Sequence, residues 1–273
     1  MSVLHVHRPL LLLLAGGILL PLFTPAQDSL AAETRANAST VILLRARANV
    51  EKFFERAGEL VCSESLTQSI LGKDGKPSYQ EQSKYEYQLA VSSVSGTLRL
   101  SESRDVRKMS FHDPARTLLI TNGFTALLLI LHPSYETSYQ FVPAGAETVD
   151  GRVLNKFTYK SIPGSSSPTA MRLRGKNYPL PLSGTIWIDQ ETAAVTRLTS
   201  FVDSSLADLG LRSMSSDIHY APVEFHDPEE SYWMPLSATI DFETPLQHWR
   251  NIHRFTAYRR FQATMKIEME SNQ

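Results

Sequence analysis

The sequence predicts a mainly β protein of the α+β class, built on a curved antiparallel sheet or incomplete β-barrel of roughly nine strands. Two observations carry this prediction. From residue 59 onward, runs with a two-residue apolar/polar period follow one another, separated by turns rich in Gly, Asp and Pro. These runs do not alternate regularly with helices, so nothing favours parallel pairing. One amphipathic helix precedes the strands, and one apolar helix is expected to cover the open side of the sheet.

The first 26 residues have the layout of a secretory signal peptide. Arg8 precedes the apolar block Leu10–Phe23, and small residues follow at Thr24–Ala26. The block is shorter than the roughly 20 residues that a transmembrane helix needs, and Pro21 would interrupt such a helix. We therefore expect cleavage after Ala26, or later near Ala31-Ala32, and export to the periplasm, with the extracellular space as the alternative destination. A retained N-terminal anchor is the competing interpretation.

The rest of the chain is expected to form one domain, residues 41–273, after a flexible lead-in at 27–40. Val41–Ala57 places apolar residues at helical spacing and charged residues on the opposite face, and Gly58 can end the helix. This pattern predicts an amphipathic helix of about four turns.

An apolar helix is expected at residues 122–132. Asn122 can cap its start, Phe124–Leu131 is apolar on every side, and Pro133 follows His132. A helix that is apolar all round must be buried by protein or by ligand. It is therefore either an ordinary core helix or the lining of a hydrophobic cavity.

Extended segments account for most of the remaining sequence, with a long loop rich in Ser, Pro and Gly at 163–183. The predicted strands are 60–71, 79–91, 98–106, 139–142, 145–160 with a turn at 149–152, 184–189, 195–202, 213–225, 232–242 and 251–269.

One pair of strands has a distinctive sequence. The run Gly184-Thr-Ile-Trp-Ile-Asp189, followed by Val195–Leu198, resembles a hairpin of the lipoprotein-carrier-like fold group that LolA, LolB and RseB share. Trp233–Pro235 before a strand, the closing strand from Asn251, and the order of the elements are also similar to that group. The resemblance implies a curved antiparallel sheet whose open side is covered by helices, with a hydrophobic cavity between them.

Composition and motifs argue against several classes of partner and site. The net charge of −1 argues against nucleic acid as a partner, and no integral membrane span is expected after the signal is removed. Cys62, the single cysteine, is expected to be a buried and unreactive apolar residue. His219 and His226 lack metal-ligand spacing, and no Gly-x-Ser-x-Gly nucleophile turn is present. We predict no cofactor, no metal and no catalytic residue.

The function predicted from these features is a non-catalytic periplasmic carrier or sensor that binds a lipid or an acylated peptide. The alternatives are an adaptor for another envelope protein, with a vestigial cavity, and an enzyme whose His and carboxylate groups converge only on folding. The same residue types make a sheet core and an acyl-chain pocket, so both interpretations stay open for each candidate lining residue. These candidates are Phe124, Leu127, Leu128, Leu131, Tyr85, Tyr87, Trp187 and Phe255.

Overall fold

The computed structural model describes residues 25–56, 59–94, 97–109, 119–173, 175–202, 206–226 and 229–260. Residues 1–24, which hold most of the predicted signal peptide, lie outside these ranges. The signal peptide therefore stays a prediction.

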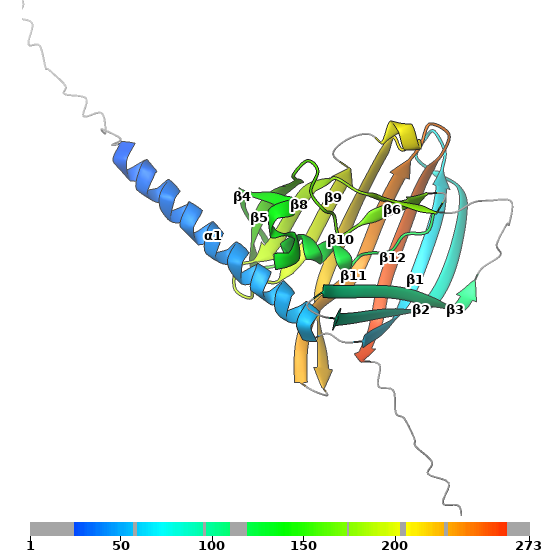
Figure 1. The fold of residues 1–273 in the computed structure, drawn as a ribbon, viewed down its shortest axis with the longest axis horizontal. Helices are drawn as coiled ribbons and strands as arrows, with labels where there is room; N and C mark the ends of the chain where they lie inside the picture. Colours follow the sequence, from blue (N-terminus) through cyan, green and yellow to red (C-terminus); the bar gives the residue numbers. More distant parts are fainter. Residues whose placement is uncertain are drawn as a thin grey trace, which may run out of the picture.

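The first element is a single long helix, α1 (Pro25–Arg56). It begins with proline, whose fixed φ suits the first turn, and contains neither Gly nor another Pro. The helix therefore includes residues 27–40, the segment that the sequence analysis expects to be a flexible lead-in. Its C-terminal half packs on the domain through buried apolar residues, including Ile42, Ala46 and Phe53, and its N-terminal half projects away (Figure 1). Among the described residues, no helix has the combined length and apolarity that would let it cross a membrane.

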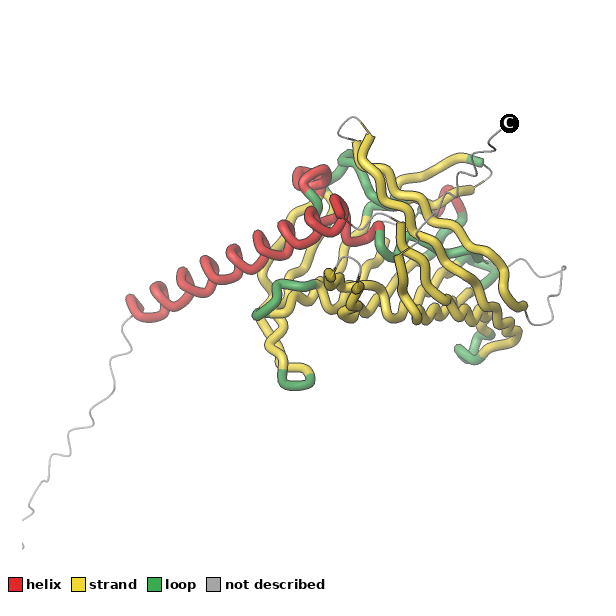
Figure 2. The backbone as a smooth tube through the Cα atoms, turned by 90° about the horizontal axis from the view of Figure 1, so that it is seen from below, coloured by secondary structure: helices red, strands yellow, loops and turns green. Residues whose placement is uncertain are grey.

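A single antiparallel sheet of ten strands forms the body of the protein, as the sequence predicts. Its order is β3-β2-β1-β12-β11-β10-β9-β8-β5-β4, so the edge strands are β3 and β4. Seen from below, the strands form a curved wall beside the helices (Figure 2). The strands are β1 (Glu59–Leu71), β2 (Pro77–Val94), β3 (Thr97–Met109), β4 (Tyr139–Val149), β5 (Arg152–Ser161), β8 (Leu182–Asp189), β9 (Val195–Val202), β10 (Ser213–His226), β11 (Glu229–Glu243) and β12 (His248–Arg260).

The predicted hairpin around Trp187 is confirmed. Strand β8 pairs antiparallel with β9, and Gly184 lies opposite Ser200. Alternation also holds in β10, where Ser216, Ile218 and Tyr220 are buried while the residues between them are more exposed. The last strand was predicted to reach residue 269, but residues 261–269 lie outside the described ranges.

Two short helices occupy the concave side of the sheet, where one apolar α-helix was predicted. Both are 3₁₀-helices, η1 (Ala126–Leu131) and η2 (Pro133–Ser138). Gly123, with φ of 88°, and Pro133 bound the apolar stretch closely, and so short a segment favours i→i+3 hydrogen bonds. Every residue of η1 is buried, as the apolar sequence predicts.

The stretch 163–183 is more ordered than the predicted loop. It contains a two-stranded hairpin of β6 (Ala170–Leu173) and β7 (Lys176–Pro179). A further short helix, η3 (Ala207–Leu209), connects β9 to β10. Figure 1 shows β6 lying over the concave face of the sheet, across strands of its central part. The hairpin and η1 therefore both cover the same side of the sheet.

Candidate ligand-binding site on the concave face

A row of mostly polar residues crosses the floor of the concave face. Residues that pair directly across neighbouring antiparallel strands project to the same side of the sheet. Polar groups on an otherwise apolar buried face are costly unless they find hydrogen-bond partners. Across β5, β8, β9, β10, β11, β12 and β1, the row is Tyr159, Gly184, Ser200, Ser216, Ile240, Asn251 and Gln68.

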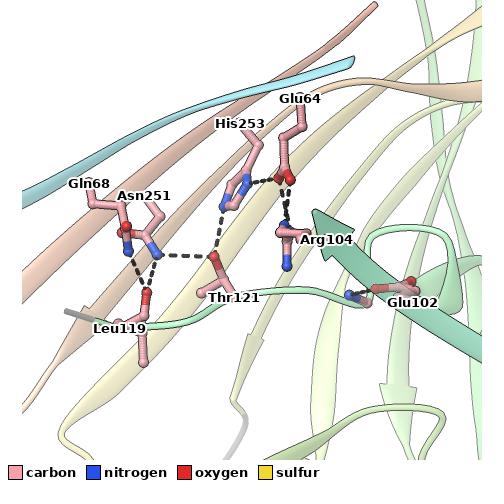
Figure 3. Close-up of polar contacts among 9 residues, drawn as sticks. Glu64, Gln68, Glu102, Arg104, Leu119, Thr121, Asn251 and His253 are labelled. Atoms are coloured by element: carbon pink, nitrogen blue, oxygen red, sulfur yellow. Dashed lines mark hydrogen bonds and ion pairs between the residues drawn. The ribbon is translucent and has the colours of Figure 1, made fainter. Parts of the chain in front are cut away.

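The β1 and β12 end of this row binds a segment that crosses the concave side. We name residues 119–123 the strap. Gln68 Nε2 and Asn251 Nδ2 both donate to the carbonyl oxygen of Leu119, at 2.8 and 2.7 Å. Asn251 Nδ2 also lies 3.0 Å from Thr121 Oγ1 (Figure 3). Side chains of the sheet therefore hold the strap, which has no strand pairing of its own.

A buried ion pair with a histidine supports the same segment. His253 is fully buried, and its Nδ1 lies 2.6 Å from Glu64 Oε1 while its Nε2 lies 2.7 Å from Thr121 Oγ1. Burial lowers the pKa of His253, so the ring is neutral near pH 7. A neutral ring donates from Nδ1 to Glu64 and accepts the Thr121 hydroxyl at Nε2. Arg104 forms an ion pair with Glu64 through Nε and donates from Nη2 at 2.9 Å (Figure 3).

The charges in this cluster balance. Burial alone would raise the pKa of Glu64, but hydrogen bonds from His253 and Arg104 outweigh that effect and hold the pKa below its usual value. Glu64 is therefore ionised beside Arg104. At the end of the strap, the Gly123 amide donates to Glu102 Oε2 at 2.6 Å. Burial raises the pKa of Glu102.

A largely apolar cavity of about 590 Å³ lies between the strap, the β6–β7 hairpin and the floor of the sheet. Ligand pockets generally measure about 300–1,000 Å³, so its size suits a small ligand. Ile120 is 83% exposed at its edge, so the cavity reaches solvent there. Its apolar lining is Leu119, Ile120, Phe124, Leu127, Ala170, Met171, Leu180, Leu182, Met214, Ile240 and Phe242, and its polar lining is Thr121, Asn122, Thr169, Arg172, Ser200 and Ser216.

Only part of the predicted lining meets in this cavity. Phe124 and Leu127 contribute to its wall. Leu128 lies instead on a second cavity, of about 500 Å³, which is bordered by Phe53 of α1 and Tyr232 of β11. The neighbouring leucines of η1 therefore face different spaces.

Three other predicted residues belong to the packed core behind the cavity. Leu131, Tyr87 and Phe255 are buried, and the Phe255 ring lies 5.6 Å from the Tyr87 ring and 5.5 Å from the Phe124 ring. Tyr85 is half-buried and pairs opposite Glu64. None of these four residues lines either of the two cavities just described.

Trp187 lies on the face opposite the cavity, so the prediction that it lines the cavity is wrong. Its neighbours Ile186 and Ile188 are fully buried in the core, whereas Trp187 is half-buried on the alternate face. There its Nε1 donates to Glu147 Oε1 at 2.7 Å, and the Arg197 guanidinium lies 4.6 Å from the ring centroid. The period of two places Trp187 and the isoleucines on opposite faces, but it does not say which face is concave.

The sequence analysis identified neither the row of polar residues on the concave face nor the β6–β7 hairpin as part of the site. Ser216 stands where the alternation of β10 points inward, so an inward polar residue could have been identified from the pattern. The pairing of Glu64 with His253 could not, because 189 positions separate them.

No protein-family model matches the sequence, and no curated protein does either. Two solved structures are similar in outline. One is a DUF1329 family protein from Desulfovibrio piger, with a TM-score of 0.37 and 12% identity over 86% of this chain and 94% of that one. The other is a putative outer membrane lipoprotein-sorting protein domain from Vibrio parahaemolyticus, with a TM-score of 0.36 and 11% identity over 84% and 93% of the two chains.

Proposed function

We propose that the protein is a non-catalytic carrier or sensor that binds the apolar chain of an amphiphilic ligand, such as a lipid or an acylated peptide, in the concave-face cavity. The observation that carries the proposal is the cavity itself, with its mainly apolar wall on the open side of the sheet. Burying an alkyl chain there contributes about 0.8 kcal/mol per CH₂ group before the costs of association.

The construction of the wall favours exchange of a ligand. The strap lines the cavity and is bonded to the sheet through side chains such as Asn251 and Gln68. It can therefore shift without breaking a strand pairing of the sheet. The predicted export of the protein would place this exchange in the periplasm.

Filling the cavity tests the proposal. Met214→Trp places a large ring in the cavity wall, and Val106→Trp is the matched control because Val106 is 58% exposed on edge strand β3. The probe is dansylundecanoic acid, whose fluorescence rises in an apolar site. We expect the parent and Val106→Trp to bind it, and Met214→Trp to bind at least about tenfold more weakly, a loss of about 1.4 kcal/mol.

Native mass spectrometry of the protein purified from a bacterial periplasm supplies the second measurement, by showing whether a lipid travels with it. Circular dichroism confirms that each variant is folded. The proposal fails if the parent neither binds the probe nor carries lipid, or if Met214→Trp binds the probe as well as the parent does.

A further inference from the structure

A single charged side chain lines the concave-face cavity, among the residues that the structure describes. It is Arg172, an exposed residue of β6 in the wall that the β6–β7 hairpin contributes. The described lining holds no acidic residue, and Arg172 forms no ion pair with any other described residue. The wall of the cavity therefore carries one positive charge that nothing in the described part of the chain neutralises.

The acidic residues closest to the cavity floor along β11 lie on the opposite face of the sheet. Phe242 lines the cavity, and successive residues of a strand alternate between its two faces. Its neighbours Asp241 and Glu243 therefore project away from the cavity. On that side Arg250 Nε donates to Asp241 Oδ1 at 2.9 Å. Arg212 Nη1 donates to Glu243 Oε1 at 3.0 Å. Both carboxylates are thus paired on the far side, and neither faces the hairpin guanidinium.

The other polar groups of the described lining are neutral. They are the hydroxyl and amide groups of Thr121, Asn122, Thr169, Ser200 and Ser216. Hydroxyls and amides can both donate and accept hydrogen bonds, so they tolerate either sign of charge on a ligand. A guanidinium only donates and is always charged. The preference of the cavity for the charge of a ligand therefore depends on the arginine of the hairpin.

We propose that the ligand is an anionic amphiphile, whose carboxylate or phosphate group binds Arg172 where the wall meets solvent while its apolar chain fills the cavity. This inference rests on the proposed carrier function and specifies its ligand class. The planar guanidinium can donate two parallel hydrogen bonds to a carboxylate or a phosphate. The apolar wall beside it lowers the local dielectric constant, which strengthens the attraction. A neutral head group would cover the guanidinium without pairing its charge, which costs binding free energy.

Four ligands with the same ten-carbon chain and different head groups test the inference. They are decanoic acid, decyl phosphate, 1-decanol and decyltrimethylammonium. Isothermal titration calorimetry of the exported protein at pH 8, where a carboxylic acid is ionised, measures the dissociation constant of each ligand. The quantity compared between variants is the dissociation constant of 1-decanol divided by that of decanoate. The hydration of the two free ligands is the same for every variant, so its contribution to the comparison cancels.

Three variants locate the effect. Arg172→Gln removes the charge and should lower the ratio about 3–10-fold, between the effects of an exposed ion pair and of a charge-assisted hydrogen bond, while 1-decanol binds as before. Lys176→Gln is the matched control, because Lys176 is an exposed residue of the same hairpin that does not line the cavity, and it should keep the ratio. Arg172→Glu reverses the charge, so decyltrimethylammonium should bind more tightly to this variant than to the parent.

The outcomes separate the two proposals. If the parent binds neither dansylundecanoic acid nor any ten-carbon ligand, the carrier function fails and this inference fails with it. If the parent binds 1-decanol and decanoate, and Arg172→Gln leaves the ratio unchanged, only this inference is refuted. It is also refuted if Lys176→Gln lowers the ratio as much as Arg172→Gln does. When the ratio falls only in Arg172→Gln, the inference is supported, and the tighter of decanoate and decyl phosphate identifies the head group.

Discussion

Two leucines of the same 3₁₀-helix, Leu127 and Leu131, allow a direct test of which side chains face ligand and which face protein. Both are buried, at 7% and 1% exposure. Leu127 lines the concave-face cavity, whereas Leu131 is packed in the core and lines neither cavity described above. Truncation of each to alanine removes the same atoms from different surroundings.

The expected costs differ because of what surrounds each side chain. Leu131→Ala opens a new void in packed core, which should lower the free energy of unfolding by about 3–5 kcal/mol. Leu127→Ala enlarges a space that already exists, so fewer packing contacts are lost and about 2 kcal/mol is expected, near the lower limit for such truncations. Ligand affinity should change in the opposite order. Loss of contacts at Leu127 should weaken binding of dansylundecanoic acid by about 1–2 kcal/mol, roughly 5–30-fold.

Urea unfolding followed by circular dichroism measures the first quantity, and titration with dansylundecanoic acid measures the second. Leu131→Ala should show the larger loss of unfolding free energy, and Leu127→Ala should show the larger loss of probe affinity. If Leu127→Ala costs as much stability as Leu131→Ala and leaves probe affinity unchanged, Leu127 is ordinary core. The assignment of the cavity as the ligand site would then be wrong.

Three further predictions concern single residues. Gly184→Ala should lower the free energy of unfolding by about 3 kcal/mol, the upper part of the usual range for overpacking, because the new Cβ would lie 1.9 Å from the carbonyl oxygen of Thr199. An unchanged urea unfolding curve would contradict this prediction. Cys62 is fully buried, as predicted, and burial raises its pKa to about 12. Maleimide should therefore label this thiol only when the protein unfolds, and rapid labelling of the native protein would refute the prediction. Burial lowers the pKa of His253 from 6.5, and the pKa of Glu64 is lowered from 4.5. The unfolded chain therefore binds protons that the folded cluster excludes, so the free energy of unfolding should fall as the pH drops below about 6.5. Equal urea midpoints at pH 7.5 and pH 5 would contradict this prediction.

The hairpin around Trp187 illustrates what local sequence can predict. Two β-rich runs joined by a short polar turn predict an antiparallel pair, and the structure has that pair. Asp189 ends the first run and accepts backbone hydrogen bonds from Glu191 and Thr192 in the turn. All of these interactions span only a few residues, which is why the sequence alone predicts them.

The glycine that opens the same run has a reason that only the fold reveals. Gly184 pairs with Tyr159 on one side and Ser200 on the other. A Cβ at this position would lie 2.9 Å from the Tyr159 hydroxyl, as well as against Thr199. The missing side chain therefore lets Tyr159 reach across β8 and donate to the carbonyl oxygen of Thr199 on β9.

The sequence by itself determined the antiparallel sheet, the burial of Cys62 and the burial of the apolar stretch after Asn122, because alternation and hydrophobicity act within a few residues of the chain. Tertiary structure alone decided that Trp187 faces away from the cavity, that the apolar stretch forms 3₁₀ turns, and that 163–183 folds back as a wall. It also brought Thr121 to His253, 132 positions apart. Contacts of this kind depend on how distant strands pair and curve, and no local pattern encodes that arrangement.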